Sequence, residues 1–407
     1  MNSHPRFTLS ARLFLAALTL SLSSSLSAQQ IRFYRIGDLP GGIFRSEVRD
    51  VVRTNSGLVA VGNATQYDGS ISGDTAIRWT PTGGLKALAP LVPNLTAMTK
   101  SIITASAISD DGKVIAARSR SHAIGNERLA VVYRNGGTTP TSLGLIPGSA
   151  EYSAATAVSS DGSVVYGWSQ NPADRFAQAF RWTAREGLTP LGFLSPGDLD
   201  SSPTPRGTTD DGSVMIGTTI SNASTGLGRA YLYKFRSGMS PLPLLPGGTW
   251  NGTFGLTPSG RTIVGYGNSS AHPNGEIVQW KRKGTVKSLG LPAGVASVAP
   301  NNGFGGISKN ARVVVFTFDT VYIHNRHGWF DLEAVLLSSD IDLHEWTTLS
   351  ASGMSSDGTL VFGTGTNVRG VEGWIAEFPH GYLASVGARK GDRPDDDPSD
   401  DSDDDDD

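Results

Sequence analysis

The chain has 407 residues, of which 17% are charged and none is cysteine. Its formal charge of −3 hides a division, because the seventeen residues from Gly391 onward hold eleven Asp and one Arg. Without that segment and without Arg6 and Arg12, 31 basic and 26 acidic residues give the body a charge near +5. This composition excludes a fold held by disulfides, and so small a positive charge does not favour nucleic acid as a partner.

Residues 1–28 have the pattern of a secretory signal peptide. Arg6 and Arg12 precede the apolar stretch 13–22, and a small-residue exit ends at Ala28. The alternative, a first helix of the domain, is disfavoured because the serine-rich exit leads straight into an extended segment. No later stretch approaches the ~18 apolar residues that cross a bilayer. We therefore expect a secreted or periplasmic monomer with no transmembrane anchor.

A short pattern recurs along the rest of the chain: a small residue, an apolar residue, a polar turn usually ending in Asp-Gly, a run of β-branched and aliphatic residues, and another glycine. It reads VSSDGSVVYG from Val158 and MSSDGTLVFG from Met354. The turn positions are Gly57, Gly112, Gly162, Gly212, Gly260, Ala311 and Gly358. Their intervals of 47 to 55 residues indicate seven copies of one structural unit.

Each unit has the pattern of four short antiparallel strands. The third copy, residues 153–194, divides into the segments SAATAV, SVVYGWS, QAFRWT and LTPLGFL, with turn residues between them. Five residues before the turn position, the second to seventh copies have only Ala or Gly, which we attribute to crowding of an innermost strand around a narrow axis. These residues are Ala107, Ala157, Gly207, Gly255, Gly306 and Gly353. We predict an all-β fold, a seven-bladed β-propeller of four-stranded antiparallel blades.

The two ends of the repeat region complement each other. The last copy lacks a fourth strand of the usual kind, whereas the N-terminal segment FYRIGDLPGG from Phe33 resembles a fourth strand without a blade. Pairing the two would hide both open sheet edges. We therefore predict that residues 31–38 complete the blade built from residues 345–380. The propeller would span residues 29–387, and residues 388–407 would form a disordered acidic tail.

A large aromatic residue recurs in the third segment of the copies, with His324 in its place in the sixth. We expect these residues to pack between blades rather than to contact a ligand. They are Trp79, Tyr133, Trp182, Tyr233, Trp280 and Trp374.

The third segment reads QAFRW from Gln178, RAY from Arg229 and TAIRW from Thr75. Together with the SxDG turns and the Leu-Gly that follows, these segments resemble the repeats of the bacterial extracellular HAF-repeat family, with Gln, Arg or Thr in place of the His that names it. The resemblance covers nearly all of residues 33–380. It implies an exported repeat protein of unassigned activity, and its structural motifs imply no catalytic residues.

The loops of such a propeller divide between two faces. The first-to-second and third-to-fourth connections are short, whereas the second-to-third and blade-to-blade loops on the opposite face are long and irregular, so we place function there. Five aromatic residues stand near the entry to the innermost strands on that face. As a ring at the channel mouth they would bind sugar rings or peptide side chains, and otherwise they plug the channel or pack loops. They are Phe44, Tyr152, Trp250, Phe304 and Trp346.

Catalytic and metal-binding patterns are weak in this sequence. We expect the turn aspartates to cap their own hairpins, and the other acids are too scattered to give the two placed carboxylates of a glycosidase, so no catalytic residue is assigned. The turn aspartates are Asp110, Asp111, Asp161, Asp210, Asp211 and Asp357. His324, His327 and His344 fall short of a zinc signature. We expect no cofactor. The one metal hypothesis that remains is calcium, bound in the loop DLDSS at Asp198 or loosely by the tail.

These observations predict a secreted, non-enzymatic binding propeller whose ligand is a carbohydrate or a protein at the cell surface. The alternative is an extracellular polysaccharide hydrolase or lyase, which requires clustered acids, His or Tyr at the channel mouth. A third hypothesis is a structural surface component whose tail binds cations.

Overall fold

The computed structural model describes residues 30–41, 43–67, 72–92, 104–120, 128–147, 149, 152–170, 177–194, 204–220, 228–282, 284–298 and 304–389. The predicted signal peptide, the loop at Asp198 and all but two residues of the predicted tail lie outside these ranges. Much of the long loops does so as well. The fold and the candidate site are therefore built from the blades and their short turns.

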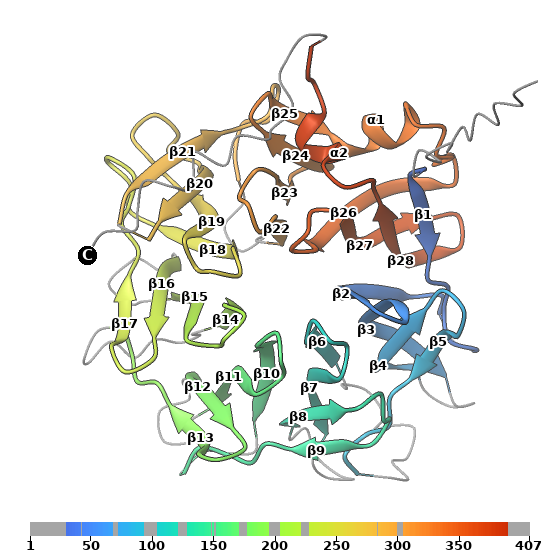
Figure 1. Cartoon of the computed structure of the whole chain (residues 1–407), viewed down its shortest axis with the longest axis vertical. Coiled ribbons are helices and arrows are strands. Elements are labelled where there is room, and N and C mark those ends of the chain that lie inside the picture. Colours follow the sequence, from blue (N-terminus) through green and yellow to red (C-terminus); the bar gives the residue numbers. More distant parts are fainter. Residues whose placement is uncertain are drawn as a thin grey trace, which may run out of the picture.

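The described residues form seven four-stranded antiparallel sheets arranged in a ring (Figure 1). Six sheets use four strands that are consecutive in the sequence, and the seventh is completed by the N-terminal strand β1. This confirms the predicted seven-bladed propeller. We number the blades 1 to 7 in the chain order of their inner strands.

Four sets of strands build the blades from the central channel outward. The inner strands are β2 (Ser46–Thr54), β6 (Thr104–Ile108), β10 (Ser153–Val158), β14 (Thr204–Thr208), β18 (Asn251–Leu256), β22 (Gly305–Ile307) and β26 (Trp346–Met354). The second strands are β3 (Gly57–Tyr67), β7 (Val114–Arg120), β11 (Val164–Gln170), β15 (Val214–Ile220), β19 (Thr262–Gly267), β23 (Val314–Thr317) and β27 (Leu360–Asn367). The third strands are β4 (Ser72–Thr80), β8 (Arg128–Arg134), β12 (Ala177–Thr183), β16 (Gly228–Lys234), β20 (Glu276–Lys281), β24 (Val321–Asn325) and β28 (Gly370–Glu377). The outer strands are β5 (Gly84–Ala87), β9 (Pro140–Ser142), β13 (Gly187–Pro190), β17 (Gly238–Pro241), β21 (Val286–Gly290), β25 (Gly328–Asp331) and β1 (Arg32–Arg35).

The core lies between neighbouring blades. Val164, Val165 and Tyr166 of β11 are all buried, as expected for a second strand covered on both faces. The third-strand aromatics also join blades, because Trp280 Nε1 donates to the carbonyl of Pro243 in the preceding blade at 2.8 Å. This confirms their predicted packing role.

The small residues of the inner strands are explained by the next blade. A Cβ atom at Gly207 would lie 2.8 Å from Leu256 Cδ2, and one at Gly306 would lie 2.6 Å from Met354 N. Both contacts come from the inner strand of the following blade. The strand position was predicted correctly, and at these two glycines the crowding comes from the neighbouring inner strand, whereas Gly353 is crowded by Phe362 of its own blade.

Strand β1 closes the ring as predicted, pairing with β28 so that Phe33 opposes Ala376 and Arg35 opposes Trp374. The Phe33 ring stacks on Trp374 with a centroid distance of 5.8 Å. Two buried carboxylates of β28, Glu372 and Glu377, bind side chains of β1. Closure therefore combines main-chain pairing, apolar contact and ion pairs.

The hairpins between first and second strands define one face, which we call the turn face; the opposite face is the loop face. Asp161 Oδ1 accepts from Ser159 Oγ at 2.7 Å and from Ser163 N at 2.9 Å. Equivalent bonds hold Asp111, Asp211 and Asp357, which confirms that these four cap their own turns.

A chain of backbone hydrogen bonds also links the turns of successive blades. Asp110 N donates to Ser160 O, Ser160 N to Asp210 O, and Asp210 N to Pro258 O, at 3.0 to 3.1 Å. A similar bond runs from Lys309 N to Ser356 O at 2.6 Å. These bonds tie blades 2 to 5, and blade 6 to blade 7, around the channel.

Two short helices were not predicted. Helix α1 (Leu332–Leu337) begins after Asp331, whose side chain accepts from Glu333 N and Ala334 N as an N-cap. Helix α2 (Tyr382–Ser385) follows blade 7 and contacts β24 of blade 6 (Figure 1). Within the described ranges, neither helix nor any other has the length and apolarity needed to cross a bilayer.

Candidate functional site

A β-bulge interrupts six of the inner strands in the described part of the chain, and the extra residue of each bulge has no partner in the sheet. In β10 the register shifts between Ala155 and Ala157, which leaves Thr156 unpaired. Bulges re-aim side chains and recur next to functional sites. The bulge residues are Arg49, Ser106, Thr156, Arg206, Phe254 and Ser352.

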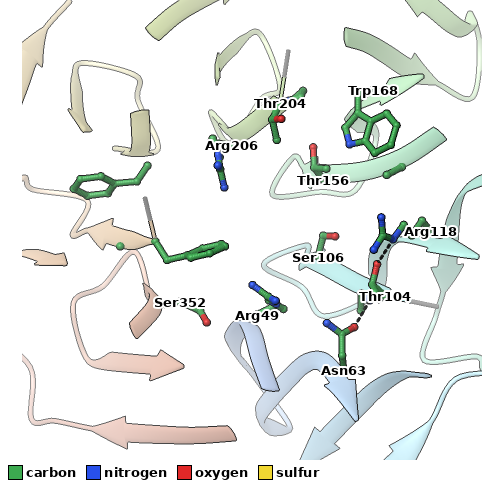
Figure 2. A pocket seen from close by; sticks show the side chains of 16 residues that line it. Arg49, Asn63, Thr104, Ser106, Arg118, Thr156, Trp168, Thr204, Arg206 and Ser352 are labelled. Carbon is green, nitrogen blue, oxygen red and sulfur yellow. Dashed lines mark hydrogen bonds between the residues drawn. The ribbon is translucent and has the colours of Figure 1, made fainter. Parts of the chain in front are cut away.

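All six bulge residues line one cavity of about 290 Å³ at the loop-face end of the central channel. In blade 6 the inner strand begins at Gly305, which also lines it. Figure 2 shows Arg49, Ser106, Thr156 and Arg206 directed toward the interior of the cavity from their separate blades. The bulges thus give the channel one side chain from each of these blades.

The cavity is strongly cationic. Arg118, from the second strand of blade 2, joins Arg49 and Arg206 in the lining. Arg49 is paired with Glu47 at 2.6 Å, whereas no described carboxylate lies within ion-pair distance of Arg118 or Arg206. No described Asp or Glu lines the cavity. An anion entering here meets two guanidinium groups that have no acidic partner of their own.

Two of these arginines have pKa values below the usual arginine value. Burial lowers the pKa of Arg206, and the positive charge of Arg49 lowers it further. Burial likewise lowers the pKa of Arg118, with added repulsion from Arg128 and Arg49, and the negative charge of Asp74 opposes this shift in part. Arginine stays protonated under such shifts. A bound anion would relieve the mutual repulsion of these charges.

Phe304 lies between two of the arginines. The guanidinium carbon of Arg49 is 5.2 Å from the centroid of the Phe304 ring, and that of Arg206 is 5.6 Å from it. The ring is 43% exposed and faces the cavity lining. It offers a flat apolar surface directly beside the two cations.

Unsatisfied polar atoms mark the same cavity. Arg206 Nε and Thr156 Oγ1 are buried and have no hydrogen-bond partner among the described residues. Buried polar atoms normally have partners, so such atoms call for an explanation. By contrast, Arg118 Nε donates to Thr104 Oγ1 at 2.8 Å, and Asn63 Oδ1 accepts from Ala105 N at 3.1 Å. The cavity lining therefore contains polar groups fixed by hydrogen bonds, on Arg118 and Asn63, and polar atoms without a hydrogen bond in the described structure, on Arg206 and Thr156.

The five aromatic residues predicted to stand at the channel mouth are dispersed. Of these five, the described lining of the cavity includes only Phe304. Trp250 is 5% exposed and packs beside Tyr266 within blade 5. Trp346 meets the edge of Phe33 at the closure of the ring. Geometry thus supports packing for these two.

The remaining two predicted residues are half-buried and pair with arginines outside this cavity. The guanidinium carbon of Arg369 lies 4.7 Å from the centroid of Phe44, and that of Arg128 lies 5.3 Å from the centroid of Tyr152. The structure brings no ring of five aromatics together.

The turn-face end of the channel has the opposite charge. A cavity of about 310 Å³ is lined there by Asp50, Asp110, Asp210 and Asp357, with Arg53 among them. Asp110 and Asp210 do not cap their own turns as predicted. Asp110 instead accepts from Ser160 Oγ of the next blade at 2.8 Å, and burial beside Asp110 and Asp211 raises the pKa of Asp210. The channel thus runs from a cationic to an anionic end.

Asp50 is the most perturbed acid of this end. It is half-buried, and its two oxygens accept from Val51 N at 2.8 Å and Ile108 N at 2.9 Å. Burial raises the pKa of Asp50 to about 7 despite these bonds, and negative Asp110 adds to the effect. An aspartate in an unfolded chain titrates near pH 4. The folded state therefore gains stability from the proton at acidic pH, and this gain is lost as the pH rises through about 7.

We expect Asp50→Asn to gain about 2 kcal/mol of unfolding free energy relative to the wild type between about pH 5 and about pH 8. The quantity to compare is the change of the unfolding free energy with pH, not its absolute value. Asn has only one oxygen for the two hydrogen bonds, so the variant also differs from the wild type at every pH. Urea titrations at both pH values measure it. Asp161→Asn is the matched control and should follow the wild-type pH profile over this range, because the bond from Ser163 N lowers the pKa of Asp161 and the group stays ionised between these pH values. Parallel pH profiles for Asp50→Asn and the wild type would contradict the prediction.

Metal ligands do not gather in the described residues, which contain no group of three or more His, Asp or Glu side chains suited to hold an ion. His324 is half-buried beside Trp329, and burial lowers its pKa. His344 is exposed and bonded to Asp342. His324 and His344 therefore have separate surroundings.

The bulge residues were missed by sequence reasoning, yet a signal for them exists. Five of the six directly precede the small residue of their inner strand, as Ser106 precedes Ala107 and Arg206 precedes Gly207, whereas Arg49 precedes Asp50. That position varies among Ser, Thr, Arg, Phe and Gly from the second copy to the seventh. Variation beside an invariant packing position is the pattern of a residue that packing does not constrain.

No family model matches the sequence, and no curated protein matches it. Among solved structures, an oligogalacturonate lyase from Vibrio parahaemolyticus has a TM-score of 0.55 at 12% identity, covering 87% of this chain and 98% of that one. An oligogalacturonate lyase in complex with manganese has a TM-score of 0.51 at 13% identity, covering 83% and 98%. TolB from Acinetobacter baumannii has a TM-score of 0.43 at 14% identity, and this chain covers 64% of its length. At these identities the likeness shows the propeller fold alone.

Proposed function

We propose that this protein is an exported binding propeller that holds a carboxylate-bearing carbohydrate at the loop-face end of its central channel. The observation that carries the proposal is the convergence of Arg49, Arg118 and Arg206 on one cavity in which no described acid takes part. Guanidinium groups bind carboxylates through paired, charge-assisted hydrogen bonds. A ligand anion would supply the missing partner of Arg206 Nε.

The remaining lining suits a sugar. Ser106, Thr156 and Ser352 place hydroxyl groups around the cavity, and Phe304 gives a flat apolar face on which a sugar ring can stack. The combination of a few placed polar groups with aromatic surface is typical of small-molecule sites. Two propellers of similar fold are named oligogalacturonate lyases, but at 12–13% identity the anionic ligand rests on the arginines of this chain.

Binding is favoured over polysaccharide cleavage by the chemistry of the cavity. A glycosidase needs two placed carboxyl groups. The described residues of the lining include no Asp, Glu, His or Tyr, and the acids of the channel lie at its turn-face end. The described lining can orient and neutralise an anion, and it offers no carboxyl group to act on a glycosidic bond.

The test is calorimetric titration of the mature chain with oligogalacturonate and, in parallel, with its fully methyl-esterified, uncharged form. We expect binding of the acid form only. Arg206→Gln should weaken that binding about tenfold to a hundredfold, since a hydrogen-bonded charge contributes roughly 1.5 to 3 kcal/mol. Arg236→Gln, on the turn face of the same blade, is the control and should leave the affinity unchanged.

Three outcomes would overturn the proposal: equal binding of the ester, equal loss in both variants, or no binding of either sugar. Binding of poly-glutamate without binding of oligogalacturonate would also reject a carbohydrate ligand, in favour of an acidic protein segment. Melting curves of both variants show whether a loss of affinity reflects the site or the fold.

A further inference from the structure

The turns of the fifth and sixth repeats differ from those of their neighbours, because they carry basic residues and no Asp. The first hairpins of blades 2 to 4 carry Asp at one or both central positions, whereas those of blades 5 and 6 read TPSGRT from Thr257 and SKNARV from Ser308. The outer turns of blades 5 and 6 read KRKG from Lys281 and NRHG from Asn325. Four turns of the same face therefore hold cations and no acid.

We call the described cations of these turns the basic turn surface. Its members are Arg261, Lys281, Arg282, Lys309, Arg312 and Arg326. Arg261, Lys281, Arg282 and Lys309 are exposed, and these four form no ion pair with a carboxylate in the described structure. Arg282 N donates to Arg261 O at 2.9 Å, which keeps two of them adjacent. A groove of about 700 Å³ brings Lys234, Arg282 and Lys309 to one depression, with Asp210 and Asp211 on its blade 4 side.

The C-terminal segment leaves the described body beside this surface. Asn325 Nδ2 donates to Leu383 O at 2.9 Å and to Val386 O at 3.0 Å. These bonds fasten α2 to the turn that carries Arg326 and His327 (Figure 1). The last described residue is Arg389, and eighteen residues follow it, eleven of them Asp. At about 3.4 Å per residue, such a segment spans roughly 60 Å when extended, enough to cross two blades.

We infer that the acidic tail of this chain, residues 391–407, lies across the basic turn surface of blades 5 and 6. A run of aspartates next to several exposed cations gains Coulomb energy without any defined fold of its own. The contact neutralises the basic turn surface of blades 5 and 6, which leaves the loop-face cavity as the accessible cationic site. Because the two lie on opposite faces, the tail contact and the proposed channel function stand independently.

Zero-length carbodiimide cross-linking of the mature full-length chain tests the contact, since it joins Asp carboxylates to Lys amines within salt-bridge distance. We expect mass spectrometry to find cross-links from the tail to Lys281 and Lys309. Lys86 of blade 1 and Lys113 of blade 2 are the internal controls and should give none. In about 1 M salt, where the screening length is about 3 Å, the yield should fall at least about tenfold.

Two further experiments test whether the cross-links depend on the basic turn surface and whether they form within one chain. The double variant R261Q/R282Q should lower the cross-link yield at Lys309 severalfold without altering the melting temperature, because both arginines are exposed. Mixing ¹⁵N-labelled and unlabelled chains separates contact within one chain from contact between copies. Cross-links spread evenly over all lysines, absent altogether, or mostly between labelled and unlabelled chains would overturn the inference. A tail that cross-links while oligogalacturonate fails to bind would reject only the channel function.

Discussion

Glu372→Gln is expected to lower the free energy of unfolding by about 3 kcal/mol. The Glu372 side chain is fully buried on β28, and it holds the N-terminal segment to blade 7. Arg35 Nη2 donates to it at 3.0 Å and Gly37 N at 3.1 Å, while Asn367 and Arg369 complete the set. Removing the charge leaves two arginines facing a neutral amide, and breaking a buried ion pair is strongly destabilising.

Urea unfolding at neutral pH measures this effect. Glu186→Gln is the matched control, because Glu186 is also paired with an arginine, Arg181, at 2.7 Å but is 46% exposed. Exposed pairs contribute about 1 kcal/mol or less. Similar losses in the two variants would show that Glu372 does not secure the closure of the ring.

Gly62→Ala is expected to cost about 3 kcal/mol through steric overlap. A Cβ atom at Gly62 would lie 1.9 Å from the carbonyl oxygen of Glu47 and 3.1 Å from Val48 Cα. Gly62 pairs with Val48, directly before the bulge that turns Arg49 into the channel. The inner strand lies close to the second strand at this point, so the bulge at Arg49 requires a glycine at position 62.

Blade 2 provides the control for this prediction. There Ala117 takes the equivalent place, paired with Ala105 before the bulge at Ser106. Ala117→Gly should cost only about 1 kcal/mol, the loss expected for glycine in a strand. Thermal unfolding compares the two variants. Equal decreases of their Tm would mean that the carbonyl of Glu47 moves away from the added methyl group at little cost.

The repeat pattern was sufficient to predict the scaffold because the residues that build it pack against one another in every blade. Gly207 and Gly306 are small because the next inner strand passes beside them, and Trp280 is large because it fills the space to the preceding blade. Such requirements recur with the period of the fold and are visible in one sequence. The ring closure followed from the same logic, since a missing fourth strand and a spare one complement each other.

The site was predicted less well, for three physical reasons. A β-bulge changes the register without leaving a mark in the alternation of apolar and polar residues, so alternation alone does not distinguish Arg206 from a residue that faces a neighbouring blade, and only its variation among the copies does. Adjacent aspartates were equally ambiguous: Asp211 caps its turn, whereas Asp210, one residue earlier, lines the channel. Of the aromatics chosen by their position near the loop face, Trp250 is needed to fill blade 5.

The bulges separate the part of the chain that keeps the ring intact from the part that meets the solvent inside it. Each bulge residue has no strand partner, so substitution there leaves the hydrogen-bonded ladder unchanged, although Phe254 also packs on Phe316 of the next blade. In this chain the positions carry Arg49, Ser106, Thr156, Arg206, Phe254 and Ser352. The polar residues that line the channel can therefore vary one blade at a time while the strands of every blade stay paired.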